Sequence, residues 1–427
     1  MTTVLNIFNI PLKKLSLILV LVVAGELIFS LPFHIPRFFR PTMLEVFQLT
    51  NAQLGDIFAV YGVVAMLSYF PGGVLADRFA PRKLMTFSLL ATSAGGLYFV
   101  TIPKVEALYF LFGYWGLTSI LLFWSAMIKQ TRILAGANSQ GLAFGLLDGG
   151  RGLIASLTAS IAVFILALFL LPDAESYQDK RSGLQAVALF YSCVTMLAGL
   201  LVWFFIPRQN ISFPAKEQQR PSITNILKVL KEQSVWLQGG VIICAYCGFK
   251  ALDNYGIYAT QVMQMSQLES SELTSIASYT RPLVAVIAGL IADRWQASKS
   301  VKLFFILSGL GFLGMSLFEF GNQLQILIIA NIVLTFIAVY ALRAVYFALV
   351  EQAKIKQGVT GTAVGVISLV GYTPDIFFSS VTGRILDANP GFIGFQHYFL
   401  LLSMISIVGI IFVYLLDKSL NKAKLEP

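Results

Sequence analysis

Apolar residues are arranged along this chain in long unbroken runs that short polar stretches separate. Runs such as LSLILVLVVAG (15–25) and IAVFILALFLL (161–171) do not alternate in polarity as the strands of a membrane barrel do. Each run is long enough to cross the bilayer as a helix, which needs about 20 residues. We predict twelve crossings, near residues 15–33, 54–76, 84–101, 107–128, 141–171, 185–206, 235–258, 273–292, 302–320, 325–349, 359–386 and 397–416.

The composition of the chain agrees with a membrane environment. Hydrophobic residues occupy 57% of the 427 positions and charged residues only 12%, whereas soluble proteins carry about 25% charged residues. Such a chain cannot cover a water-exposed surface with polar side chains. The predicted fold class is an all-α membrane protein.

Basic residues are distributed unevenly between the two sets of loops that these crossings create. Of the 30 lysines and arginines, roughly 20 lie on one side and about 5 in the opposite loops, a bias that marks the basic side as cytoplasmic. Both termini are therefore predicted to be cytoplasmic. The net charge of +9 follows this placement, so no nucleic-acid partner is expected. The first apolar run lacks a small-residue cleavage site and is interpreted as a retained helix.

Metal-ligating residues are sparse. Cys244 and Cys247 form a CxxC inside an apolar crossing, where small core residues are the ordinary interpretation. The only histidines, His34 and His397, are placed near the non-cytoplasmic rim. A zinc site needs several such ligands together. We expect no metal, no cofactor and no disulfide framework.

The chain is predicted to divide into two halves. Its longest polar segment, 207–234, lies at the midpoint and leaves six crossings on each side; part of it has the spacing of an amphipathic surface helix. The stretches GGVLADRFAPRK (72–83) and GLIADRWQASK (289–299) share a G-x-x-x-D-R core, each after the second crossing of its half. The predicted domains are 1–206, 207–234 as a cytoplasmic loop, and 235–427. Such internal duplication is typical of secondary transporters.

These repeated residues resemble the cytoplasmic signature of the major facilitator superfamily. The first copy comprises Gly73, Asp77, Arg78, Arg82 and Lys83, and the weaker second copy comprises Gly289, Asp293 and Arg294. Ala80 stands where the family usually has glycine, and the second copy keeps only Lys299 of the basic pair. The resemblance covers the whole chain. It implies two six-helix bundles that move a small molecule across a bacterial inner membrane by alternating access, as a monomer in contact with lipid.

The resemblance also assigns a gating role to the signature. A glycine permits close approach of helices, and an aspartate at the cytoplasmic edge can face the positive end of another helix. Asp77 would face the start of the eleventh helix, near Thr360 and Gly361, and Asp293 the start of the fifth, near Gln140 and Gly141. These contacts would close the cytoplasmic side.

Ionisable residues inside the hydrocarbon are costly and mark functional sites by default. Glu26, Arg151 and Arg281 are predicted at similar, mid-membrane depth from a rise of about 1.5 Å per residue. Two guanidinium groups suit an anion, because the arginine fork binds a carboxylate or phosphate bidentately. Glu26 is interpreted as a lone carboxylate. Because desolvation favours its neutral form, Glu26 is a candidate for carrying a proton.

Further charges have alternatives that the sequence leaves open. Asp148 with Arg151, and Lys250 with Asp253, are spaced i,i+3 and could neutralise each other. Asp148, Arg151 and Arg281 could equally form a structural network instead of contacting the substrate. The remaining candidates are Asp148 and Asp375 for proton coupling, and Lys250, Arg343 and Tyr255 for substrate binding.

The leading functional prediction is a secondary transporter of a small organic or inorganic anion, coupled to protons or to a counter-substrate. The run from Arg281 to Asp293 is loosely similar to the nitrate/nitrite branch of the family. A zwitterionic or neutral nutrient is the alternative substrate, and a drug or metabolite exporter is disfavoured because the glycine-proline signature of drug/proton antiporters is absent. No P-loop is present, and a membrane enzyme lacks a nucleophile with its base. A transporter-like sensor would have little surface for a signalling partner.

Overall fold

The computed structural model of the chain describes residues 12–135, 140–170, 176–208, 229–317, 325–349 and 360–425. These residues form helices and contain no strand. Ten helical stretches are long and apolar enough to cross a membrane, and the bent pair Lys14–Leu27 and Ser30–Phe38 makes an eleventh. α6 (Pro81–Val100) occupies the remaining predicted crossing. The predicted all-α membrane fold is confirmed.

Two compact units make up the chain, the first comprising 1–212 with 265–282 and the second comprising 213–264 with 283–427. Residues 265–282 therefore group with the first unit, although the predicted boundary assigns them to the second half. The predicted cytoplasmic loop at 207–234 lies mostly outside the described residues, so that division of the chain stays a prediction.

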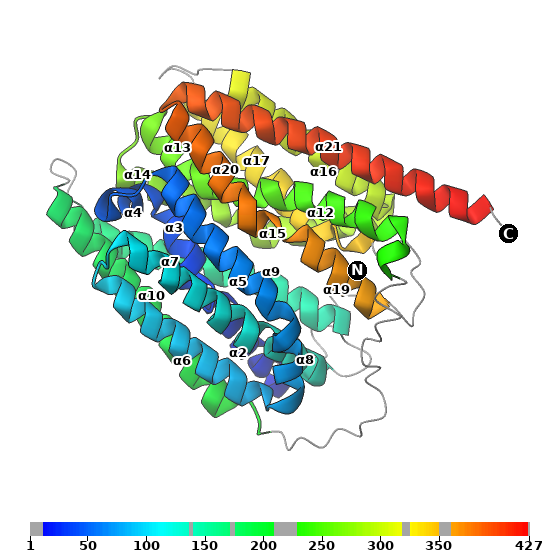
Figure 1. Ribbon diagram of the computed structural model, residues 1–427, viewed down its shortest axis with the longest axis horizontal. Coiled ribbons are helices and arrows are strands. Elements are labelled where there is room, and N and C mark those ends of the chain that lie inside the picture. The colour runs from blue at the N-terminus through cyan, green and yellow to red at the C-terminus, as the bar shows by residue number, and fades with distance from the viewer. Residues whose placement is uncertain are drawn as a thin grey trace. The chain divides into compact units, whose positions relative to one another are not determined.

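The first unit is built on long helices packed side by side. Its elements are α2 (Leu12–Leu27), η1 (Ser30–His34), α3 (Ile35–Phe38), α4 (Arg40–Phe47), α5 (Asn51–Arg78), α6, α7 (Val105–Gly116), η2 (Leu117–Trp124), α8 (Ser125–Ala135), α9 (Gln140–Ala167), α10 (Tyr177–Phe205) and α14 (Gln267–Ser278). α6 runs along α10, and α2 packs on α9 (Figure 1). Aromatic rings fill the unit's core, with Phe112 lying 5.0 Å from Trp115 and 5.5 Å from Phe58 between ring centroids.

The second unit has the same helical character. Its elements are α12 (Gln233–Ala251), η3 (Leu252–Asn254), α13 (Tyr255–Gln261), α16 (Ala297–Leu317), α17 (Gln325–Val345), α19 (Thr360–Gly371), α20 (Pro374–Ala388) and α21 (Phe392–Leu425). α15 (Thr280–Trp295) begins in the first unit and continues into the second. α21 runs along α16 and α12 (Figure 1).

Large apolar side chains also cover the outer surface of both units. Phe70 is 72% exposed, and Phe110 and Ile326 are each 81% exposed. Soluble proteins rarely expose apolar surface so extensively. These side chains are suited to contact lipid.

Several crossings are interrupted, and proline explains two of the interruptions. After α2, Pro32 in η1 has no N–H to continue the hydrogen-bond ladder. The Leu27 carbonyl instead accepts hydrogen bonds from the hydroxyls of Ser30 and Thr195, at 2.7 and 3.1 Å. Between α19 and α20, Pro374 starts a new helix, and the Thr373 hydroxyl donates to the Val370 carbonyl at 2.7 Å. A further interruption, η3, follows α12.

Candidate substrate-binding site

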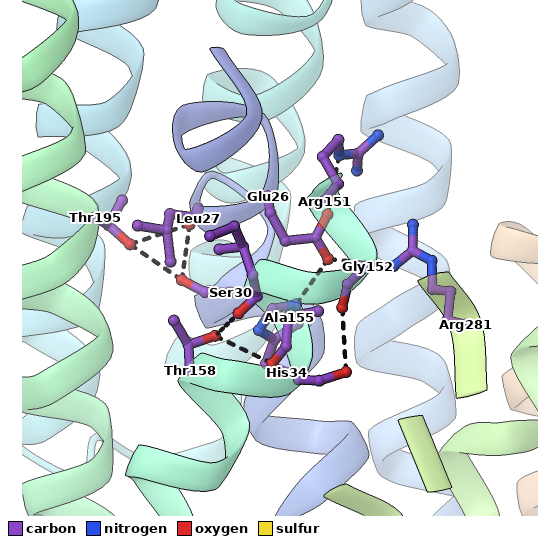
Figure 2. Close-up of polar contacts among 12 residues, drawn as sticks. Glu26, Leu27, Ser30, His34, Arg151, Gly152, Ala155, Thr158, Thr195 and Arg281 are labelled. Carbon is purple, nitrogen blue, oxygen red and sulfur yellow. Dashed lines mark hydrogen bonds and ion pairs between the residues drawn. The ribbon is translucent and has the colours of Figure 1, made fainter. Parts of the chain in front are cut away.

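A buried carboxylate with three cationic or imidazole partners forms the first candidate site, the Glu26 cluster, which comprises Glu26, His34, Arg151 and Arg281. Arg151 Nε donates to Glu26 Oε2 at 2.9 Å, and Arg281 Nη1 donates to Glu26 Oε1 at 3.4 Å. His34 Nε2 lies 3.2 Å from the same Oε1 atom. Figure 2 shows the Glu26 carboxylate in the middle of this cluster. All four residues are buried, at 4 to 9% exposure.

The interruption of the first crossing positions two members of the cluster. Glu26 is the penultimate residue of α2, and His34 is the last residue of η1. The helical segments on the two sides of the interruption meet at 46°. Sequence reasoning placed His34 at the rim and missed this partner. The signal that was available is a histidine eight positions after an intramembrane carboxylate, beyond a proline.

Arg151 extends from α9 into an aromatic and small-residue setting. Its guanidinium carbon lies 5.4 Å from the centroid of the Phe29 ring and 5.8 Å from that of Trp124. A guanidinium within about 6 Å of a ring centroid is stabilised by the ring's electrons. A Cβ atom at Gly25 would stand 2.7 Å from Met127 Sδ and 3.5 Å, an ordinary contact distance, from Arg151 Cδ. The glycine therefore leaves room for Met127, and the arginine stem packs beside it.

Arg281, in the first turn of α15, reaches the carboxylate past another glycine. A Cβ atom at Gly152 would stand 3.1 Å from both Cγ and Cδ of Arg281. Arg281 Nη2 lies 3.7 Å from Asp148 Oδ1, and the Asp148 side chain is 51% exposed. The sequence spacing allowed Arg151 to pair with Asp148 and left open a network that includes Arg281; the structure shows Arg151 on Glu26 and Asp148 beside Arg281.

The interpretation of Glu26 as a lone carboxylate is therefore wrong. Helical periodicity predicts only contacts between residues three or four positions apart. The arginine partners of Glu26 come from two other elements, 125 and 255 positions away. The buried part of the cluster contains two guanidinium groups and one carboxylate, so positive charge is in excess. The further negative charge beside Arg281, that of Asp148, is half exposed.

A second buried ionic cluster lies within the second unit. This Lys250 cluster comprises Tyr246 and Lys250 on α12, Asp253 on η3 and Asp375 on α20. Lys250 Nζ is 3.4 Å from Asp253 Oδ2 and 3.6 Å from Asp375 Oδ1. The Tyr246 hydroxyl is within hydrogen-bond distance of both Asp375 oxygens, at 3.1 and 3.0 Å. The i,i+3 pairing predicted for Lys250 and Asp253 is present.

The other predicted substrate-binding residues of the second unit lie in different surroundings. Arg343 stacks on Phe249, with its guanidinium carbon 3.9 Å from the ring centroid. Tyr255 is 1% exposed, and its ring lies 5.3 Å from Phe336 and 5.6 Å from Phe399. Its position is that of an aromatic core residue. A substrate role for Arg343 or Tyr255 stays a prediction.

The cytoplasmic signature has a packing role that differs from the expected one. A Cβ atom at Gly73 or Gly289 would meet none of the described residues within 4 Å, so neither mediates the expected close approach there. The preceding residue Gly72 does, because its added Cβ would stand 2.9 Å from the Leu121 carbonyl oxygen. Arg82 stacks on Trp203, with 4.4 Å between guanidinium carbon and ring centroid. Asp77 and Asp293 are exposed, and their predicted gate contacts stay predictions.

In the described part of the chain, ten or eleven helical segments that are long and apolar enough to cross a membrane define the class of protein as a polytopic membrane protein. The sequence matches the family model of the Major Facilitator Superfamily over residues 16–379. The chain therefore belongs to the major facilitator superfamily and is a transporter, not an enzyme. This finding confirms the resemblance that the repeated signature carries.

Two known relatives match nearly the whole chain, and a third matches more than half of it. The inner membrane proteins YqcE and YihN of Escherichia coli K12 are each 28% identical, over 90% and 97% of this chain and 90% and 98% of their own lengths. The protein named "Probable nitrate/nitrite antiporter NarK1" of Thermus thermophilus is 26% identical over 59% of this chain and 56% of its own length. A solved structure of the nucleoside transporter NupG, in mutant form, has a TM-score of 0.74 at 12% identity, over 95% of this chain and 99% of that one. This last likeness shows the fold.

Proposed function

We propose that the chain is a secondary transporter of a small monovalent anion, organic or inorganic, which the Glu26 cluster binds. The observation that carries this proposal is the pair of buried arginines, Arg151 and Arg281, that share a single buried carboxylate. Burying a charge without a counter-charge is costly. Among the buried groups, one added negative charge balances the two guanidinium groups and Glu26 without any proton.

The geometry allows an anion to compete with Glu26 for the guanidinium groups of Arg151 and Arg281. Glu26 accepts from Arg151 through one oxygen and lies near Arg281 and His34 with the other. An incoming anion can take over the guanidinium donors while Glu26 keeps His34 as its partner. In the absence of substrate, the Glu26 carboxylate thus binds the guanidinium groups at the position that the anion would take, as an internal occupant of the anion site. The likeness to NarK1, whose name gives nitrate and nitrite as its substrates, supports an inorganic anion as one member of the class.

Orientation and gating belong to the same proposal. The names of YqcE and YihN support a bacterial inner membrane, and the basic bias of the predicted loops supports two cytoplasmic termini. Membership of the family supports a monomer. Asp77 and Asp293 are proposed as gate residues of alternating access. Both are exposed, so Asp77→Asn should lower the transport rate while leaving the unfolding temperature unchanged.

A zwitterionic solute is the second candidate substrate. The observation that favours it is the Lys250 cluster, whose two carboxylates and aromatic neighbours would suit an ammonium group that takes the place of Lys250 Nζ. Tyr246 contacts Asp375, and its ring lies 5.0 Å from that of Tyr372. This second proposal predicts that the transported solute has no net charge, whereas the leading proposal requires a solute with a net negative charge.

Uptake into proteoliposomes tests the leading proposal. Proteoliposomes that contain the purified protein are supplied with labelled nitrate or with one of a panel of labelled monocarboxylates. Betaine and an uncharged sugar serve as comparisons. Arg151→Ala and Arg281→Ala should each reduce anion uptake about tenfold or more, because each removes a charged hydrogen bond of about 1.5 to 3 kcal/mol.

The matched control is Arg384→Ala, an exposed arginine within a crossing that donates to its own helix at the Ser380 carbonyl. This variant should transport as the wild type does. Uptake of betaine but of no anion would replace the leading proposal with the second. Anion uptake that survives both buried-arginine substitutions would remove the Glu26 cluster as the binding site.

A further inference from the structure

The Lys250 cluster has one cation between two carboxylates, in largely buried surroundings. The Lys250 side chain is 1% exposed and that of Asp253 is 4% exposed, whereas that of Asp375 is 18% exposed. Lys250 Nζ is almost equidistant from the two carboxylates, at 3.4 and 3.6 Å. The contacting groups therefore have negative charge in excess when all are ionised.

The two clusters stand at matching places in the two predicted halves, with their charges reversed. Lys250 follows Glu26 by 224 positions, and Asp375 follows Arg151 by the same 224 positions. Glu26 and Lys250 are each the penultimate residue of the helix that precedes an interruption. In the first unit the carboxylate is on the interrupted helix and the cation on α9; in the second, the cation is on α12 and a carboxylate on α20. Among the groups that define each cluster, positive charge is in excess in the first and negative charge is in excess in the second.

A further cation would have little space beside the two carboxylates of the Lys250 cluster. A metal ion or an ammonium group would need to contact the Asp375 and Asp253 oxygens, but Lys250 Nζ already stands within 3.6 Å of both carboxylates and would repel it. A proton needs no such space, because it bonds to a carboxylate oxygen. Among the groups around Asp375, Arg343 adds a positive charge from α17 at longer range, and Tyr246 and Tyr372 add hydroxyl groups.

Asp375 is better placed than Asp253 to accept that proton. Its side chain is more exposed, and the Tyr246 hydroxyl can donate to one oxygen while the other takes the proton. Asp375 is also the second residue of α20, where the helix N-terminus favours the ionised carboxylate. The acid is therefore not permanently neutral, and both of its protonation states have compensating partners.

We propose that Asp375 is the proton-binding site of this transporter and that Lys250 changes partner when the proton binds. With Asp375 ionised, Lys250 is shared between the two aspartates. With Asp375 protonated, the ammonium group pairs with Asp253 alone, and the cluster loses its excess charge. Proton binding thereby breaks the ionic contact of α12 with α20 at the interruption between α19 and α20, while the Tyr246 hydrogen bond is kept. This inference is independent of the anion proposed for the Glu26 cluster.

Infrared difference spectroscopy on the purified protein, with protons as the only ligand, tests the proposal. Acidification from neutral to mildly acidic pH should produce the carbonyl band of a buried protonated carboxyl group, and Asp375→Asn should abolish it. The control variants Glu26→Gln and Asp148→Asn should keep the band. A band that is absent from the wild type, or that disappears with Glu26→Gln and survives Asp375→Asn, would overturn the assignment.

Two further variants keep the test decisive if Asp375→Asn fails to fold. Lys250→Met removes the positive neighbour and should move the midpoint of the band's titration to more alkaline pH by about 1 to 3 pH units. Asp253→Asn removes a like charge and should move that midpoint in the acidic direction. Midpoints that move the same way, or not at all, contradict the partner exchange. None of these measurements involves anion uptake, so failure of this proposal and failure of the proposed substrate class are separable.

Discussion

His34 Nε2 lies 3.2 Å from Glu26 Oε1 although the two residues are eight positions apart and the helical segments that carry them meet at 46°. The interruption after Leu27 thus does more than relieve the backbone at Pro32. It brings an imidazole to a carboxylate that also accepts from Arg151. The interrupted first crossing is therefore part of the construction of the Glu26 cluster.

Replacing His34 by phenylalanine tests the contribution of this contact. The new ring can keep the edge contacts with Phe38 and Tyr191, both 5.7 Å from the imidazole centroid, but it cannot bond to Glu26. Loss of a hydrogen bond to a charged group should lower the stability by about 1.5 to 3 kcal/mol, measured by thermal unfolding in detergent. His397→Phe, at an exposed position, is the control and should leave the unfolding temperature unchanged.

Replacing Gly152 by alanine should weaken anion binding while the fold is kept. The added Cβ would stand 3.1 Å from Cγ and Cδ of Arg281 and push the guanidinium away from Glu26. A displacement that costs one charged hydrogen bond corresponds to about tenfold or more in affinity, measured as nitrate-dependent thermal stabilisation. Gly149→Ala on the same helix, with open space at its Cβ, should bind as the wild type does. Equal effects of the two substitutions would contradict the positioning role of Gly152.

The fold could be predicted from the sequence because its signals are local and additive. Apolar runs fix the crossings through the thickness of the bilayer, and the repeated G-x-x-x-D-R core identifies the family. The interruptions were less visible, since a run such as VLVVAGELIFSLPF remains apolar through the position where α2 ends. Hydropathy indicates whether a segment lies in lipid or in water, but it does not indicate where the backbone departs from a regular helix.

The candidate site could be predicted only as a set of residues. The cost of burying charge singled out Glu26, Arg151 and Arg281, and these do lie together. Their pairing could not be predicted, because i,i+3 spacing offered Asp148 to Arg151 while the tertiary packing offered Glu26. His34 was missed because the first crossing was predicted to end at residue 33, which placed His34 at the rim, whereas the interruption brings its imidazole to Glu26.

The two adjacent glycines of the signature give a direct comparison of packing and gating. The signature specifies which residue types occur in α5, but the rotation of the helix about its axis determines which of the two glycines faces a neighbouring helix. Gly72→Ala would place a methyl group 2.9 Å from the Leu121 carbonyl oxygen and should destabilise the protein by about 1 to 3 kcal/mol through overpacking. Gly73→Ala meets no described residue within 4 Å and should change stability by less than about 0.5 kcal/mol. Thermal unfolding of the two variants checks the difference. Comparable destabilisation by both would show that the packing surface of α5 is broader than Gly72.

Replacing Glu26 by glutamine separates its structural role from its role as internal occupant of the anion site. The substitution keeps the shape but removes the buried negative charge that the two guanidinium groups share, which should cost about 3 to 5 kcal/mol. Because the same guanidinium groups then lack their internal competitor, added nitrate should raise the unfolding temperature of Glu26→Gln by more than it raises that of the wild type. Glu45→Gln is the matched control. It removes a carboxylate that pairs with Lys180 and is 42% exposed, so its cost should be about 0 to 1 kcal/mol with no change in the nitrate effect. If Glu26→Gln is destabilised but nitrate stabilises it no more than the wild type, Glu26 holds the arginines without standing in for the substrate.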